Sequence, residues 1–223
     1  MTLRWLHLRL SAPLLSFGGV AIDHVGPTRD MPSASTLTGL IANAIGWRRE
    51  ESAAHQALQD RLVFGALIVR QGRLLTDTQN AKLEARDRGW TTLGQPETRA
   101  GATYDSPHRR RRDHLADHDC RVVLRLTGDY APTIDDLAQA LDRPARPLFI
   151  GRKHCLPAAP LLVGWTEGAT AHDALLSLGL SGRGAWPVEV ETDAALARDL
   201  ADLRNWRSGL HGGSRHIVEG VIA

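Results

Sequence analysis

Alternating hydrophobic and polar positions predict several β-strands along the chain. From Leu3 to Leu10, apolar residues at every second position give one strongly apolar face, as in a half-buried strand. A second strand is expected from Leu62 to Arg70, followed by a turn and a third strand that begins at Arg73. Further strands are expected over the ranges 121–127, 160–165 and 217–223.

Apolar residues spaced three or four positions apart predict helices between these strands. One helix is expected to follow Ser35, the predicted N-cap, and to end before Gly46. Another is expected to begin at Thr133 and to present one apolar face. Shorter helices are expected over the ranges 50–60 and 172–178.

The order of these elements favours one arrangement. Strand, helix, strand, excursion, strand, helix and strand follow one another over residues 1–165, which matches a ferredoxin-like βαββαβ unit. The excursion, residues 79–118, is rich in Gly, Thr and Arg and has no sustained period. Because such a stretch inside a compact domain is usually functional or disordered, we expect an α+β fold with a long excursion.

Composition limits the class of protein. A chain of 223 residues and 24.3 kDa suits one large domain or a domain with a small appendage, and 43% hydrophobic residues argue against wholesale disorder. No run approaches the ~18 consecutive apolar residues that a membrane helix needs. Arg4 comes too early for the apolar core of a signal peptide. Cys120 and Cys155 alone form neither a disulfide scaffold nor a four-ligand zinc site, so a soluble cytoplasmic protein is expected.

Arginine dominates the positive charge. Only Lys82 and Lys153 are lysines among the 27 basic residues, and the segment 82–125 carries ten basic and seven acidic residues. The planar guanidinium suits phosphate binding and base stacking. A GC-rich genome produces the same bias, so composition alone does not identify a ligand.

The run Arg109–Arg112 is the strongest basic feature. Four consecutive guanidinium groups repel one another unless a polyanion or acidic neighbours compensate them, and Asp113 and Asp117 compensate them in part. The run is therefore either a self-paired surface loop or a clamp for RNA phosphates. The nearby His108, His114 and His118 could ligate a metal, but the adjacent arginines oppose a cation, so no metal site is expected.

Two other segments could hold an anion. Gly151 allows the backbone to approach a phosphate closely, and Arg152, Lys153 and His154 could hold it, although a plain turn with exposed charge fits equally well. The loop 25–35 leads into a helix N-terminus, where the helix dipole and free N–H groups favour an anion. No nucleotide-binding glycine fingerprint and no nucleophile elbow accompanies these segments.

Several blocks of sequence together carry a family resemblance. The most specific is Arg146-Pro147-Leu148-Phe149-Ile150-Gly151-Arg152-Lys153-His154-Cys155-Leu156-Pro157. The others are the ranges 6–14, 27–46, 93–94 and 98–101, and the arginine run with Leu115-Ala116-Asp117. In this order and spacing they resemble the CasD family, the subtype I-E member of the Cas-five subunits of the CRISPR Cascade surveillance complex. The resemblance fades after Gly182.

The resemblance implies a fold and a function. It implies a ferredoxin-like (RRM-related) domain over residues 1–165, a protruding thumb hairpin at about 79–118 and a small β-rich C-terminal portion over 166–223. The family caps the 5′ handle of the crRNA and contacts the large PAM-reading subunit and the nearest backbone subunit, so target DNA is met indirectly. No cofactor and no membrane is implied. The residues expected to bind RNA are Arg29, Ser33, Ser35, Arg86, Arg88, Arg109, Arg110, Arg111, Arg112, Gly151, Arg152, Lys153 and His154.

Two other classes of function compete with RNA binding. The subtype I-C relative is a metal-independent endoribonuclease, and His24, Lys153 and His154 could supply its base, acid and cation. Because adjacent side chains in an extended segment point to opposite faces, Lys153 and His154 are expected to grip RNA without cleaving it, and no catalytic residue is expected. A scaffold that contacts only protein would leave the arginine run unexplained.

Overall fold

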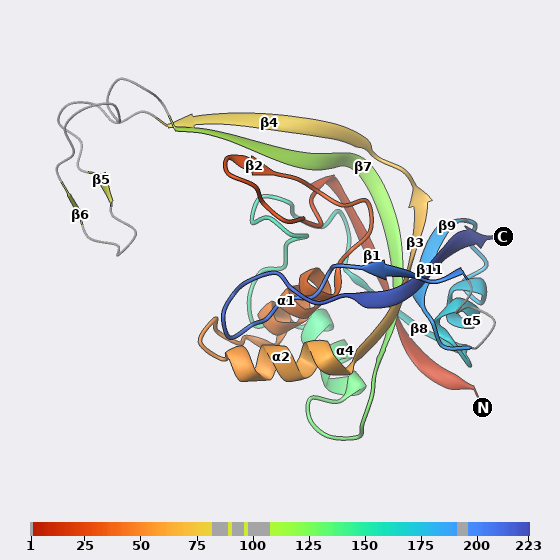
Figure 1. The fold of residues 1–223 in the computed structure, drawn as a ribbon. Coiled ribbons are helices and arrows are strands. Elements are labelled where there is room, and N and C mark those ends of the chain that lie inside the picture. The colour runs from red at the N-terminus through yellow and green to blue at the C-terminus, as the bar shows by residue number, and fades with distance from the viewer. Residues whose placement is uncertain (1, 82–88, 91–95, 98–107, 191–195) are drawn as a thin grey trace.

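A mostly antiparallel sheet organises the chain, and helices pack on both of its faces (Figure 1). The computed structural model describes residues 2–81, 89–90, 96–97, 108–190 and 196–223. Its nine-stranded sheet has the order β10-β11-β9-β3-β7-β1-β8, with β2 and β4 also paired to β7. The strands are β1 (Leu3–Leu15), β2 (Val25–Gly26), β3 (Leu62–Arg70), β4 (Arg73–Ala81), β7 (His108–Leu126), β8 (Leu162–Gly168), β9 (Gly182–Pro187), β10 (Arg198–Leu200) and β11 (Arg215–Ile222). β5 (Gly89–Trp90) and β6 (Pro96–Glu97) pair separately.

Four described helices complete the mixed α/β fold. They are α1 (Ala34–Ile45), α2 (Ser52–Arg61), α4 (Ile134–Asp142) and α5 (Ala171–Leu176). None of these helices has both the length and the apolar character needed to cross a membrane.

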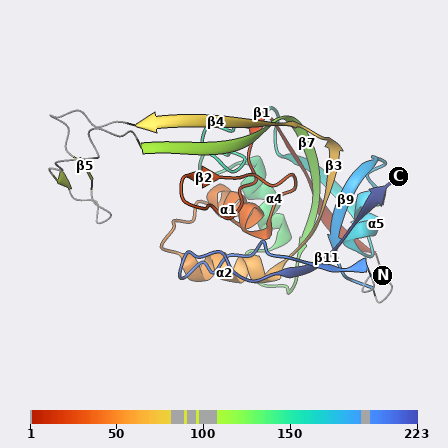
Figure 2. The same ribbon diagram turned by 45° about the horizontal axis from the view of Figure 1, so that its top comes forward.

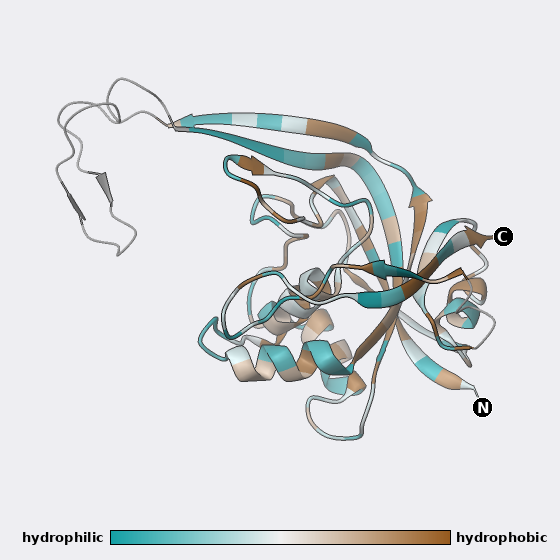
Figure 3. Cartoon of the chain, viewed as in Figure 1, coloured by the Kyte–Doolittle hydropathy of each residue, from teal (hydrophilic) through white to brown (hydrophobic). Residues whose placement is uncertain are grey.

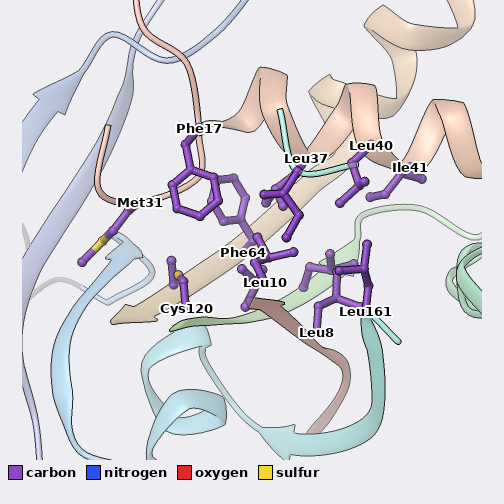
Figure 4. Close-up of a cluster of buried hydrophobic side chains, with 14 of the residues drawn as sticks. Leu8, Leu10, Phe17, Met31, Leu37, Leu40, Ile41, Phe64, Cys120 and Leu161 are labelled. Carbon is purple, nitrogen blue, oxygen red and sulfur yellow. The ribbon is translucent and has the colours of Figure 1, made fainter. Parts of the chain in front are cut away.

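The alternation along β1 explains why both faces of the sheet are covered. Leu6, Leu8 and Leu10 point into the larger core, where they pack with residues of α1 and α4, whereas Trp5 points to the other face and packs with α5. Figure 4 shows this larger core, in which the sheet residues Leu8, Leu10, Phe64 and Cys120 meet Leu37, Leu40 and Ile41 of α1.

Local sequence signals locate most elements correctly. β3 and β4 have the predicted first residues, and Thr133 caps α4 as predicted, through a capping box with Asp136. The predicted cap of α1 was wrong by two positions, because Ser33 accepts the hydrogen bond from the Thr36 amide. β9 and β10 were not predicted.

The two described ends of the excursion belong to the two strands of one hairpin. β4 pairs with the first half of β7, from Arg73 opposite Ala116 to Ala81 opposite His108. This hairpin projects from the rest of the sheet in both ribbon views (Figures 1 and 2). Residues 108–118 form the first part of β7 although their sequence has no sustained period, and the interpretation of the arginine run as a loop was wrong. No sustained period marks these strands because the outer hairpin has no face to bury: β4 is almost wholly exposed, and Figure 3 shows the outer part of β7 in hydrophilic colours. Most of residues 82–107 lies outside the described part.

Strands beyond residue 165 continue the same sheet. β8 spans the proposed boundary at 165, and β9 pairs with β3. The division into residues 1–165 and 166–223 stays a prediction.

Candidate nucleic-acid interface

Basic side chains from two distant segments meet where the β4–β7 hairpin leaves the sheet. Arg112 and His114 come from β7, and Arg152, Lys153 and His154 come from the loop that follows Ile150. We call these five residues the basic cluster. Extended backbone at β7 and a loop held against the end of β1 bring them together although they lie about 40 positions apart.

His114 is the centre of the basic cluster. Its Nε2 lies 2.8 Å from Nε2 of His154 and 3.1 Å from a guanidinium nitrogen of Arg152. Its Nδ1 lies 3.1 Å from the Arg112 carbonyl oxygen, so Nδ1 donates and Nε2 accepts. Burial, and then the charges of Arg152 and His154, lower the pKa of His114, which keeps this ring neutral at pH 7.

The arginines of the cluster are fixed by backbone carbonyls of the β2 segment. Arg152 donates to the Gly26 oxygen at 2.8 Å, and Arg112 donates to the His24 oxygen at 3.2 Å. Burial, and then the charge of Arg112, lower the pKa of Arg152. Carbonyls orient a guanidinium without neutralising it, so the cluster keeps its positive charge.

The rest of the arginine run is open to solvent. Arg109, Arg110 and Arg111 are exposed, and side chains of neighbouring residues on β7 point to opposite faces of the hairpin. Between pairs of described residues, no ion pair involves Arg109–Arg112, Arg152 or Lys153. Exposed arginines on a strand next to a basic loop favour contact with a polyanion.

The backbone conformation and packing at position 151 require a glycine. Its φ is +85°, and a Cβ atom there would lie 1.6 Å from the carbonyl oxygen of Ser16. The neighbouring Ile150 oxygen accepts a hydrogen bond from the Ser16 amide at 3.2 Å. The contact with Ser16 therefore explains this glycine without a phosphate, and an RNA contact of its backbone stays a prediction. Lys153 and His154 are exposed, as an RNA contact requires.

The N-terminus of α1 has no free amides to offer an anion. Asp202 accepts from the Ala34 amide through Oδ2 at 3.1 Å and from the Ser35 amide through its backbone oxygen at 3.3 Å. The Ser33 hydroxyl accepts from the Thr36 amide. The expectation of an anion at these amides was wrong, because Asp202, through its side chain and its backbone oxygen, and the Ser33 hydroxyl already accept from them.

The remaining predicted RNA-binding residues make no hydrogen bond or ion pair with the basic cluster or lie outside the described residues. Ser33 is buried, and the Ser35 hydroxyl lies 3.0 Å from that of Ser33. Arg29 donates to the Ala201 oxygen at 2.6 Å. Arg86 and Arg88 lie outside the described residues. Sequence reasoning missed His114 as a contact of Arg152 and His154, because no local pattern shows a pairing between a strand and a distant loop.

His114, His154 and Cys155 are the candidate metal ligands of the described part. One ligand atom of each lies within 4.8 Å of the others. However, Nε2 of His114 already accepts from Arg152, and burial raises the pKa of the Cys155 thiol, which disfavours the thiolate that a metal needs. The surrounding positive charge also opposes a cation, so the arrangement suits an anion better.

Comparisons with known proteins agree with each other. The family model described as "CRISPR-associated protein (Cas_Cas5)" matches residues 5–218. The chain is 28% identical over 173 residues to the "CRISPR system Cascade subunit CasD" of Escherichia coli (strain K12), covering 78% of this chain and 76% of that protein.

Two solved structures share the fold. One, described as "CRISPR RNA-guided surveillance complex", superposes with a TM-score of 0.72 at 21% identity over 98% of this chain and 90% of the other. A second, "Crystal structure of Cas protein", has a TM-score of 0.64 at 24% identity over 100% and 95%.

Proposed function

Because the chain belongs to the Cas5 family of CRISPR-associated proteins, we propose that it is the crRNA-binding subunit of a type I-E Cascade complex and holds the 5′ handle of the crRNA. The basic cluster is the observation that carries this proposal. It combines three cationic side chains with two imidazoles at the root of an exposed hairpin. Single-stranded RNA offers closely spaced phosphates and unstacked bases, which arginines bind well.

The strand order supports a finer description of the fold. Within the sheet, β3-β7-β1-β8 with the crossing helices α1 and α4 has the connectivity of a ferredoxin-like βαββαβ domain. We propose this assignment, with the β4–β7 hairpin as the thumb that reaches along the RNA toward a backbone subunit. The proposed partners are that subunit and the large PAM-reading subunit, with target DNA bound only through the assembly.

We propose that the chain binds RNA without cleaving it. General acid–base cleavage needs a titratable pair aimed at the 2′-hydroxyl and the leaving oxygen. Nε2 of His154 is directed at His114, which in turn accepts from Arg152, so this pair stabilises the loop. Cleavage of repeat RNA that survives EDTA and is lost in His154→Ala would favour the endoribonuclease instead.

The proposal is tested by RNA affinity as a function of salt. The full chain is titrated with RNA that carries the handle of its own repeat, beside the double variant Arg110→Ala/Lys153→Ala. Both side chains are exposed, so melting points should match. Each lost phosphate contact should reduce the slope of log K against log salt by about 0.7 to 0.9.

The control is Arg143→Ala, which removes an equally exposed guanidinium at the end of α4. Its slope should equal that of the parent chain. Equal slopes for all three proteins would remove Arg110 and Lys153 from the RNA site and contradict the proposal.

A further inference from the structure

A cavity of about 350 Å³ lies next to the basic cluster. Phe149 and Gly151 line it, as do residues of the C-terminal segment from Ala201 to His211. This volume is at the lower end of the ~300–1,000 Å³ typical of small-molecule sites. A cavity of this size suits one nucleotide and not a longer stretch of RNA. The cavity therefore adjoins the proposed path of the RNA.

Two guanidinium groups and one imidazole line this cavity, from two segments of the chain. They belong to Arg29, Arg204 and His211. Burial, and then the charges of Arg204 and Arg29, lower the pKa of His211, which keeps its ring neutral at pH 7. Burial and the charge of Arg49 lower the pKa of Arg204, so the guanidinium groups lie close to one another.

Little negative charge offsets these groups. Asp202 is the acidic residue of the lining, and its carboxylate is fully buried against Arg215 at 2.6 Å. Nε of Arg204 is buried and has no hydrogen-bond partner among the described residues. Guanidinium groups that lie close together with little negative charge nearby form an unfavourable arrangement that an anion would relieve.

Arg204 is held in place before any ligand arrives. The side-chain amide of Gln59 accepts from its backbone N–H at 3.2 Å and donates to its carbonyl oxygen at 2.9 Å. Gln59 also accepts from the indole of Trp206 at 3.0 Å, and that indole lies against His55 with ring centroids 4.7 Å apart. The segment thus holds the backbone of Arg204 and the ring of Trp206 in place, which reduces the entropic cost of binding.

We propose that this cavity is a nucleotide subsite: Arg204 and Arg29 bind an RNA phosphate, and the splayed base lies against Phe149 or Trp206. The inference rests on the proposed function, since RNA that passes Gly151 enters the cavity directly. It also gives a role to the segment after residue 200, in which the sequence alone predicted no RNA-binding residue. Aromatic side chains stack on bases with little sequence preference, so no base identity follows.

The first test compares Arg204→Gln with the parent chain in binding of handle RNA. The variant should bind about tenfold more weakly, which corresponds to 1.4 kcal/mol, while Arg143→Ala should bind as the parent does. Unchanged affinity of a folded Arg204→Gln overturns the subsite. If Arg110→Ala/Lys153→Ala weakens binding and Arg204→Gln does not, the subsite fails while the proposed function stands; no loss in either refutes the proposed function.

The second test needs no variant and covers the case in which Arg204→Gln does not fold. Ultraviolet crosslinking of unmodified handle RNA to the full chain, read by mass spectrometry, should give an adduct on Phe149 or Trp206. Adducts confined to β7 and the segment 152–154 overturn the proposal. Titration with nucleoside 5′-monophosphates identifies the source of the phosphate: competition with RNA at millimolar concentrations is expected, whereas micromolar binding of a free nucleotide would replace RNA as the ligand and overturn the proposal.

Discussion

Replacing Asp202 with asparagine should lower the free energy of unfolding by about 3–5 kcal/mol, the usual cost of breaking a buried ion pair from one side. The Asp202 carboxylate is fully buried and accepts two hydrogen bonds from Arg215, at 3.0 and 2.6 Å, and one from the Ala34 amide. Asparagine retains one acceptor but turns an N–H group toward the guanidinium. Arg215 is then left largely buried with no anion, packed over Phe64 at 4.0 Å.

Urea unfolding measures this loss, and an exposed pair in the same chain provides the control. Asp142 lies 3.7 Å from Arg143, and both side chains are more than half exposed, so Asp142→Asn should change the unfolding free energy by no more than about 0.5 kcal/mol. In the double variant Asp202→Asn/Arg215→Met, part of the loss should be recovered, because no unpaired charge remains buried. Equal effects of Asp202→Asn and Asp142→Asn would refute this reasoning.

Three further substitutions test other parts of the structure. Gly151→Val should lower the melting point sharply even without RNA, since its Cβ would overlap the Ser16 oxygen; a normal melting point would contradict the close contact. Burial and a neighbouring arginine lower the pKa of His7 to about 4, so the unfolded chain binds a proton that the folded chain does not. The free energy of unfolding should therefore fall between pH 6.5 and 4 by at most about 3 kcal/mol from this residue, and His7→Phe should flatten the decline seen by calorimetry. Arg61→Lys should cost about 2 kcal/mol in urea unfolding, because the guanidinium donates to four backbone carbonyls that one ammonium cannot reach together; an unchanged midpoint would count against that network.

The helices were predictable because their signals are local. Thr133 and Asp136 lie three residues apart and form a capping box, and the apolar face of α4 repeats at helical spacing. The error at α1 has a tertiary cause. Both Ser33 and Ser35 are good caps in isolation, and Asp202 selects between them by bonding to the amides of Ala34 and Ser35.

β9 could not be predicted because its sequence lacks the usual pattern of a strand and it forms by pairing with β3. Its sequence, Gly-Arg-Gly-Ala-Trp-Pro, has neither alternation nor β-branched residues. Gly182 has a φ of +155°, and a Cβ there would lie 2.1 Å from the Ile68 oxygen. The strand depends on close approach to β3, which only the folded sheet can show.

In the candidate sites, too, features of a short stretch of sequence could be predicted, whereas contacts between distant segments could not. A run of charge such as Arg109–Arg112 is visible in the sequence, whereas its strand conformation is not, because an exposed hairpin needs no apolar face. The sequence identified Arg152 and His154 but not His114, which contacts both. Arg204 was missed for the same reason, since its neighbours Arg29 and Arg49 come from other segments.

Asp202 connects the fold to the placement of the basic groups. By closing the N-terminus of α1, it removes the site where a helix dipole would otherwise attract a phosphate. It also neutralises Arg215, so its carboxylate is not a partner of Arg204 or Arg29. Arg112 and Arg152 are fixed by carbonyls and keep their charge. The buried acid thus stabilises the chain while the positive charge stays at the surface, where an RNA backbone can neutralise it.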